Sequence, residues 1–539
     1  MWSVNKIIQV SLFVINFLVV ILALSFFYPK GMYYYFNSDA LYAPVIFRGL
    51  FIDGSGLEGW NFNAAPNFFP DFLGYSLVNM IISDFKWAMV VFSGVQYAGL
   101  MILLTWLLYR VNRKITHIFA ILGNVCMWIF FGVAVFAIDY YFAFLHLSIS
   151  YHLGPFILTI LSLVSISYLW REPRINFYYY LLLVTVFLGV LNNRLYIVMF
   201  IIPFLLSISV FYKKKKIFVQ KVGLGAFISA TLGMLGFWGM KQSESVIFIS
   251  TGWKMFNFEN IKGSIEVWWN QLSGFLNPLD LRGIIFLLSL ISYLLMLQYV
   301  IKSFRKIFSN RENNLHFEDF YVVFFFVFIP IVFLVPIING AYVGSAIIRY
   351  NIHVYYFSIF NWGYLFFKFF EQRIQTKEVL LNKISFTSLI ALLVLLIAGI
   401  YLKRDSFMEF VQYKPDYVKR IDDFAAKHDV KYGTGSYWYS KTTTMFSDRD
   451  VRMYHLYSNF RTYHHSLNQN WFYDSGKGKH SRPDFRFIVT SDSASDSLNI
   501  RKLLGEPTIV EPFKNLRILK YPSYKFDKET RLPYLAEDE

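Results

Sequence analysis

Long apolar runs recur along most of the chain and constrain its fold more than any other feature. A helix of about 20 apolar residues is long enough to cross the hydrocarbon core of a bilayer. The composition agrees with this, since 56% of the 539 residues are hydrophobic, 16% are charged and the mean hydropathy is +0.43. Those values are too apolar for a soluble enzyme of this length. The sequence therefore predicts a polytopic α-helical membrane protein.

The apolar runs predict about eleven membrane spans. Their limits are least defined near Asn192-Asn193-Arg194, where polar residues interrupt an apolar stretch. The expected centres of the spans are Val19, Met101, Phe130, Leu161, Val186, Phe200, Ala230, Leu290, Phe328, Phe360 and Val394.

Basic residues gather in alternate loops, which predicts the orientation of the chain. Loops rich in Lys and Arg stay in the cytoplasm, so the loops between these clusters are expected outside. The net charge of +16 then reflects topology and attraction to anionic lipid, and nucleic acid is not an expected partner. The expected location is a cell membrane, compatible with the bacterial cytoplasmic membrane. The basic clusters are Arg110 to Lys114, Arg171 to Arg174, Lys213 to Lys221, Lys302 to Lys306 and Arg373 to Lys377.

The chain changes character after about residue 403. Residues 1–403 are expected to form the membrane domain, with a first external loop at 30–85, and residues 404–539 a soluble extracytoplasmic α/β domain. Within the second part, the patterns predict strands at 485–490, 507–510 and 516–521, with a turn near Lys514, and a helix at 496–504. Adjacent His464 and His465 are expected in a solvated loop, because neighbouring side chains on a strand point apart and no further metal ligand stands at a suitable spacing.

The first external loop carries the most suggestive acids. Asp39 stands at the edge of the first span, where a carboxylate is costly to desolvate and is a functional candidate by default. The alternative is an ordinary helix cap, with Ser38 or Asp39 accepting from the first N–H groups of a helix from Ala40 to Leu50. That helix is expected on the membrane surface. The acids of this loop after Asp39 are Asp53, Glu58 and Asp71.

The order of one span, an external Asp39-x-x-Tyr42, a surface helix and a Pro-containing re-entry at Ala65–Phe72 resembles the GT-C superfamily of membrane glycosyltransferases, notably the protein mannosyltransferases and the lipid A aminoarabinose transferase. Asp139-Tyr140-Tyr141 and Arg349-Tyr350 are similar to further elements of that family. The chain departs from the pattern in three places, with Ala40 after the acid, Asn351 after Arg349-Tyr350, and Pro66-Asn67 where a basic residue or a second proline is common. The resemblance implies a donor in which a sugar is linked to polyprenyl phosphate or polyprenyl diphosphate, and an acid at the active site that corresponds to Asp39.

The chemistry gives each candidate a role. A carboxylate can take the proton of an attacking hydroxyl, which makes Asp39 the expected general base. A guanidinium can meet the charge that develops on a departing lipid phosphate, and this role is expected for Arg349 or Arg194. Arg349 could instead only snorkel at the interface, and Arg194 could cap the break between two short helices. The expected substrate-binding residues are Tyr42, Asp71, Asp139, Arg194, Arg349 and Tyr350.

Several alternatives stay open at this point. Asp71 could cap the next helix rather than reach the site, and Asp139 could anchor the acceptor, share a divalent cation with Asp39 or end a helix. The acceptor could be a lipid, a glycan or a protein. The rival classes are a transporter or flippase of lipid-linked glycans, which would carry charges near the bilayer midplane, and a non-catalytic membrane assembly protein.

Overall fold

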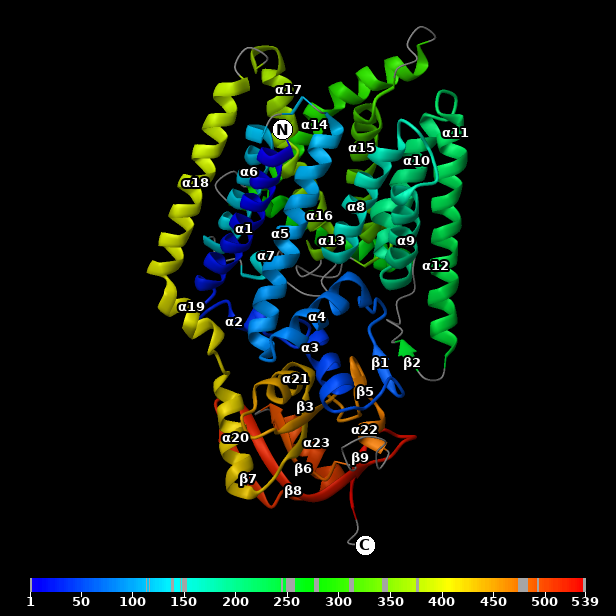
Figure 1. Ribbon diagram of the computed structural model, residues 1–539. Coiled ribbons are helices and arrows are strands. Elements are labelled where there is room, and N and C mark those ends of the chain that lie inside the picture. Colours follow the sequence, from blue (N-terminus) through cyan, green and yellow to red (C-terminus); the bar gives the residue numbers. More distant parts are fainter. Residues whose placement is uncertain are drawn as a thin grey trace.

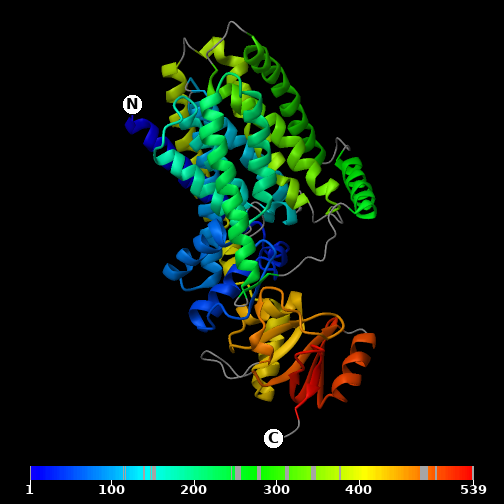
Figure 2. The same cartoon turned by 90° about the vertical axis from the view of Figure 1, so that its right-hand side faces the viewer.

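The computed structural model describes residues 2–112, 114–115, 117–136, 140–145, 147, 153–243, 246–248, 257–275, 281–309, 315–341, 348–374, 378–473, 483–491 and 494–536. It has three layers (Figure 1): a bundle of apolar helices, a layer formed by the first loop, and a C-terminal region built around a β-sheet. The same order is seen after a quarter turn (Figure 2), with the chain ends on opposite sides of the loop layer. The fold therefore sets the first loop between the bundle and the sheet.

Helices make up the bundle. Six of those described are long and apolar enough to cross a membrane: Ile7–Ser25, Phe85–Val111, Lys216–Gln242, Gly283–Phe308, Phe317–Ile338 and Ile384–Leu402. The bundle elements are α1 (Trp2–Ser25), α5 (Phe85–Val111), α6 (His117–Phe136), α8 (Leu153–Leu169), α9 (Phe177–Asn192), η3 (Ile197–Ile201), α10 (Ile202–Val210), α11 (Lys216–Phe218), η4 (Val219–Gly223), α12 (Leu224–Gln242), α14 (Leu281–Phe308), α15 (Phe317–Ile338), α16 (Ile348–Phe360), α17 (Trp362–Ile374) and α18 (Glu378–Leu402).

The expected count of about eleven spans is not confirmed. Several of the predicted spans are apolar helices of fewer than 18 residues, among them α8 and α9. The span expected around Phe360 is two helices, α16 and α17, which meet at the fully buried Asn361, and the Tyr321 hydroxyl donates to the Asn361 side chain. Apolar composition alone does not show where a polar residue divides a run into two short helices.

The first loop holds α2 (Met32–Tyr35), α3 (Tyr42–Phe47), η1 (Arg48–Ile52), β1 (Trp60–Phe62), η2 (Phe68–Phe72) and α4 (Leu73–Ile81). The helix expected from Ala40 to Leu50 is found at Tyr42–Ile52, where α3 continues into the π-helix η1. All six residues of α3 are buried, so it packs within the protein instead of lying on a lipid surface. Two helices before the C-terminal region belong neither to the first loop nor to the bundle elements given above: α7 (Tyr140–Leu145) and α13 (Phe258–Phe275).

A small sheet joins the first loop to the C-terminal region. Strand β1 pairs in parallel with β2 (Val246–Phe248) and antiparallel with β5 (Leu467–Asn468). Three segments far apart in the sequence thus share backbone hydrogen bonds, which fixes the loop against the region below it.

The C-terminal region is a mixed sheet with helices, in the strand order β4-β3-β6-β8-β7, with β9 paired to β8. The strand at 485–490, the helix at 496–504 and the hairpin that turns at Lys514 are confirmed. Its elements are α19 (Arg404–Val411), α20 (Asp416–His428), β3 (Tyr432–Ser436), α21 (Tyr437–Phe446), β4 (Arg452–Leu456), α22 (Asn470–Tyr473), β6 (Phe485–Ser491), α23 (Ala494–Leu504), β7 (Ile509–Phe513), β8 (Leu516–Phe526) and β9 (Pro533–Leu535).

Candidate functional site

Asp39 lies in the turn between α2 and α3, and it does not cap a helix. The Ala40 N–H donates to Asn37 Oδ1 at 2.8 Å, and α3 begins at Tyr42 without a side-chain cap. The prediction that Ser38 or Asp39 is the cap was therefore wrong. Because the Asn37 side chain accepts the hydrogen bond from the backbone of this turn, the side chains of Ser38 and Asp39 can contact another part of the chain.

That other part is helix α21. The Tyr437 hydroxyl donates to Asp39 Oδ1 at 2.6 Å, and the Ser38 hydroxyl donates to the Tyr437 carbonyl oxygen, also at 2.6 Å. The Lys441 ammonium lies 3.3 Å from the Ser38 carbonyl oxygen and 3.2 Å from the Tyr437 hydroxyl. Residues four apart lie on one face of a helix, so α21 presents Tyr437 and Lys441 together to the turn that holds Asp39.

Burial and charge give this group its electrostatics. Lys441 is 2% exposed, and burial lowers its pKa to about 7 against the opposing effect of the Asp39 carboxylate. Burial, with the charge of Lys441 as a second cause, lowers the pKa of His465 to about 4, while Asp39 acts in the opposite direction. Near neutral pH, His465 is therefore neutral and Lys441 is close to its midpoint.

His455 on β4 packs against the ring of Tyr437. Burial, followed by the Lys441 charge, lowers the His455 pKa well below its ordinary value. The ring is therefore neutral, and because Nε2 lies 2.7 Å from the His465 carbonyl oxygen, Nε2 carries the hydrogen. Nδ1 is left without a hydrogen-bond partner among the described residues.

Aromatic rings continue from this group across the C-terminal region. The Tyr437 ring contacts those of His465 and Tyr463, with centroids 5.3 Å and 5.7 Å apart. The Tyr463 ring in turn lies 4.3 Å from that of Tyr457. The expectation that His464 and His465 stand in a solvated loop was wrong, because both are half-buried among these rings.

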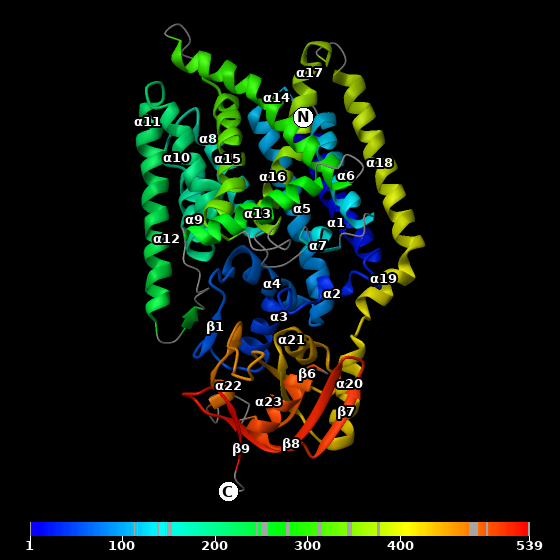
Figure 3. The same cartoon turned by 180° about the vertical axis from the view of Figure 1, so that it is seen from behind.

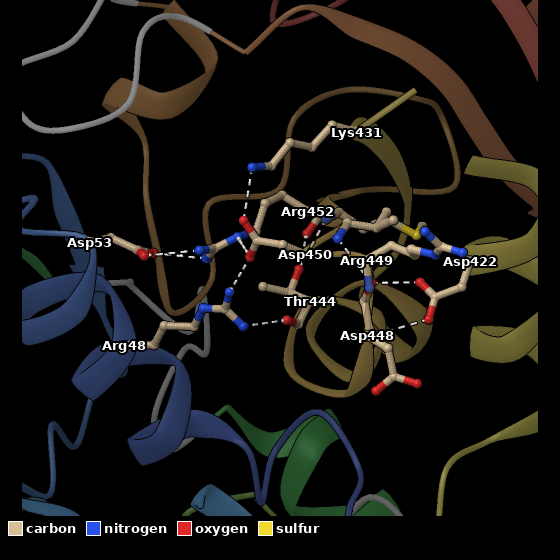
Figure 4. A network of polar contacts seen from close by, with 12 residues as sticks. Arg48, Asp53, Asp422, Lys431, Thr444, Asp448, Arg449, Asp450 and Arg452 are labelled. Atoms are coloured by element: carbon tan, nitrogen blue, oxygen red, sulfur yellow. Dashed lines mark hydrogen bonds and ion pairs between the residues drawn. The ribbon is translucent and has the colours of Figure 1, made fainter. Parts of the chain in front are cut away.

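A network of ion pairs holds the first loop onto the C-terminal region (Figure 4). Arg452 on β4 makes two hydrogen bonds to the Asp53 carboxylate, at 2.8 Å and 2.9 Å, and both side chains are buried. Arg48 pairs with Asp450 and donates to the Thr444 carbonyl oxygen at 2.8 Å. We call the Asp53–Arg452 and Arg48–Asp450 pairs the latch. Asp53, one of the acids of the first loop, is therefore paired with Arg452 and serves to hold the loop in place.

A small cavity of about 20 Å³ lies between the latch and the group around Asp39. This volume has room for about one water molecule. Its lining includes Arg48, Asp53, Lys441 and His455, so residues of the latch and of the site line the same small cavity.

Tyr42 and Asp71 are both buried in the loop layer. The Tyr42 hydroxyl donates to the Pro66 carbonyl oxygen at 2.9 Å, which ties the start of α3 to the Pro-containing re-entry. Asp71 lies inside η2 and accepts from the Gln96 side chain at 3.1 Å, so the prediction of a helix cap at Asp71 was wrong. The role of either residue in binding a substrate stays a prediction.

Arg194 lies beside the re-entry of the first loop. The expected interruption of the apolar run is confirmed, since α9 ends at Asn192. The Asn193 side chain donates to Asn67 Oδ1 at 3.1 Å, and Arg194 donates to the Ala64 carbonyl oxygen at 2.9 Å. The break between α9 and η3 therefore docks onto the loop layer, with an exposed guanidinium at its end.

Arg349 and Tyr350 occupy the first turn of α16, where the Arg349 guanidinium lies 5.2 Å from the centre of the Tyr350 ring. Asp139 lies outside the described residues. Within the described part of the chain, no three His, Cys, Asp or Glu side chains are placed to hold a metal ion together. The phosphate-binding role of Arg349 and the shared cation both stay predictions.

The class of protein that this architecture defines is a multi-pass helical membrane protein with a C-terminal α/β region. Among solved structures, the chain is similar to the Archaeoglobus fulgidus oligosaccharyltransferase, determined in complex with Zn and sulfate. The identity is 12%, the match covers 90% of this chain and 69% of that chain, and the TM-score is 0.41. No family model and no curated protein matches the sequence.

Proposed function

We propose that the chain is a membrane glycosyltransferase of the GT-C type. In this proposal it moves a sugar from a polyprenyl-phosphate donor to an acceptor on the extracytoplasmic side. The observation that carries the proposal is the placement of Asp39. Its half-buried carboxylate accepts the Tyr437 hydroxyl at 2.6 Å, where the turn between α2 and α3 contacts helix α21 of the C-terminal region. A carboxylate held in one orientation at the membrane edge is suited to a substrate that is part lipid and part sugar.

Asp39 acts as the general base in this proposal. The acceptor hydroxyl attacks the anomeric carbon of the donor sugar, and its proton passes to the Asp39 carboxylate as the new glycosidic bond forms. The bond between the anomeric carbon and the phosphate oxygen breaks, and polyprenyl phosphate leaves with the electron pair. Tyr437 is a positioning residue, because its hydrogen bond orients the carboxylate without touching the reacting atoms.

Arg349 and Arg194 are proposed to meet the charge on the departing phosphate. A guanidinium offers two N–H donors to one phosphate and keeps its charge in an apolar setting. Arg194 is exposed beside the loop layer and Arg349 is half-buried at a helix start. Tyr42, Asp71, Asp139 and Tyr350 are proposed to shape the substrate site around them.

The extracytoplasmic side is supported by the distribution of positive charge. The amino-terminal end of α1, the turn before α11 and the carboxyl-terminal end of α14 lie at the end of the bundle away from the sheet (Figure 3). Lys213 to Lys216 and Arg305 with Lys306 belong to these segments. Basic residues mark the cytoplasmic side, so Asp39 and the C-terminal region are proposed to face outward.

The proposal is tested with purified protein in lipid vesicles and a panel of radiolabelled polyprenyl-phosphate sugars, with a membrane extract as the source of acceptor. Wild type is expected to transfer label, and Asp39→Asn is expected to lose transfer because the variant keeps the shape and removes the basic oxygen. Asp405→Asn is the control, since the Asp405 side chain is 89% exposed on α19. Full transfer by Asp39→Asn would refute the assignment of the base, and no transfer with any donor would favour a transporter or an assembly protein.

A further inference from the structure

A pocket of about 490 Å³ opens on the C-terminal region, beside the ring of Tyr457. Two loops form it: the turn after β4 and the turn between β8 and β9. The residues that line it are Tyr457, Ser458, Asn459, Arg461, Glu529, Thr530 and Arg531.

Backbone hydrogen bonds hold the two turns of the pocket in place. The Tyr457 N–H donates to the Arg461 carbonyl oxygen at 2.9 Å, which closes the first turn. The Thr462 N–H donates to the Arg531 carbonyl oxygen at 3.0 Å, which joins the two turns. Backbone bonds therefore hold both arginines at fixed positions, and a ligand would not have to order the loops.

The charge of the pocket favours an anion. Arg461 and Arg531 are both exposed, and neither side chain makes an ion pair with any described residue. The nearby Asp527 accepts the Thr530 N–H at 2.6 Å and the Thr530 hydroxyl at 2.7 Å, so it serves the turn. Two guanidinium groups against the single lining acid, Glu529, leave the pocket positive.

The run of aromatic rings connects the pocket to Asp39. Tyr457, which is 48% exposed, lies 4.3 Å from Tyr463, and Tyr463 lies 5.7 Å from Tyr437, the residue that donates to Asp39. Tyrosine offers an apolar face and a polar hydroxyl, which suits the C–H faces and hydroxyl groups of sugar rings. An extended glycan could thus lie over the rings with one end at Asp39 and the other in the pocket.

We propose that the pocket and these rings bind an anionic glycan, whose sugars carry carboxylate or phosphate groups, as the acceptor. The acceptor role rests on the proposed function, whereas the binding does not. The charged groups pair with Arg461 and Arg531, and a hydroxyl at the end of the chain reaches Asp39. The lipid-linked donor does not suit this place, because the pocket belongs to the C-terminal region, which the loop layer separates from the bundle (Figures 1 and 2).

The test measures binding to the full chain in lipid nanodiscs by isothermal titration calorimetry at low salt. The probes are tetragalacturonate, the neutral cellotetraose and inorganic phosphate. Tetragalacturonate is expected to bind most tightly, and Arg461→Gln and Arg531→Gln are each expected to weaken it by about fivefold, as suits an exposed ion pair. Arg486→Gln is the matched control, because Arg486 is a half-exposed arginine of β6 already paired with Asp484.

The proposal would be overturned by equal binding of cellotetraose, by unchanged binding in both arginine variants, or by binding of phosphate as tight as that of tetragalacturonate. Absence of binding would do the same. Asp39→Asn is expected to keep the affinity for tetragalacturonate. Binding without transfer would therefore refute the proposed function and keep the glycan site, whereas transfer without binding would refute the glycan site alone.

Discussion

Asp53→Ala is expected to loosen the attachment of the first loop, because it removes one member of a buried ion pair. Asp53 is 4% exposed and Arg452 is 7% exposed, and the two share hydrogen bonds of 2.8 Å and 2.9 Å. Loss of one partner of a buried pair costs about 3–5 kcal/mol, mainly because the other charge is left without compensation. Arg452 keeps its bond to the half-exposed Asp450 at 3.1 Å, so we expect a cost near the lower end, about 3 kcal/mol.

The assay is hydrogen exchange of the backbone amides in β1, β5 and α21, read by mass spectrometry on the full chain in nanodiscs. If the whole cost of about 3 kcal/mol weakens the attachment of the first loop to the C-terminal region, the equilibrium constant for local opening rises about 150-fold, since every 1.4 kcal/mol is a factor of ten. The double variant Asp53→Ala with Arg452→Met is expected to open less than Asp53→Ala alone, because it leaves no buried charge unpaired. Unchanged exchange in Asp53→Ala, with Asp405→Asn as the surface control, would refute this account of the latch.

Three further perturbations test the site and its supports. Tyr437→Phe should lower the transfer rate by about tenfold with little change in donor affinity, because it removes only the hydrogen bond that orients Asp39; a pure change in donor KM would contradict a positioning role. Between about pH 7 and 10 the unfolded chain binds a proton at Lys441 that the buried lysine of the folded protein does not, so the free energy of unfolding rises with pH by up to about 1.4 kcal/mol per unit. Lys441→Met should flatten this rise in thermal unfolding, and equal slopes in both proteins would contradict the prediction. Gly154→Ala should lower the free energy of unfolding by about 1–3 kcal/mol, because its added Cβ would stand 2.2 Å from Asp71 Oδ2 and 2.9 Å from Pro70 Cδ. The control is Gly99→Ala, where a Cβ meets nothing within 4 Å. Equal melting temperatures of the two variants would show that the first loop moves aside without cost.

The elements of the C-terminal sheet could be predicted well from the sequence because their signals are local. Alternation and apolar runs mark β6 and the β7–β8 hairpin, and each strand pairs within the same region. The membrane spans could be predicted less well, because their limits depend on polar residues such as Asn192 and Asn361, whose partners are distant in the sequence. Length and hydropathy do not record those partners.

The candidate site could be predicted only in part, for the same reason. Asp39 stands out as an acid at the edge of a span, but its partner Tyr437 is 398 residues away. A spacing of four residues between Tyr437 and Lys441 is too common to mark a site by itself. Asp53 carries the same local signal as Asp39, and only its distance of 2.8 Å from Arg452 shows that it serves the structure.

The most direct test of the central claim is the single-turnover rate of sugar transfer by Asp39→Asn, with donor binding measured in the same sample. If Asp39 is the general base, the rate falls roughly 100- to 10,000-fold, while the donor affinity and the melting temperature stay close to those of wild type. A rate within a few fold of wild type at equal donor affinity would contradict the account.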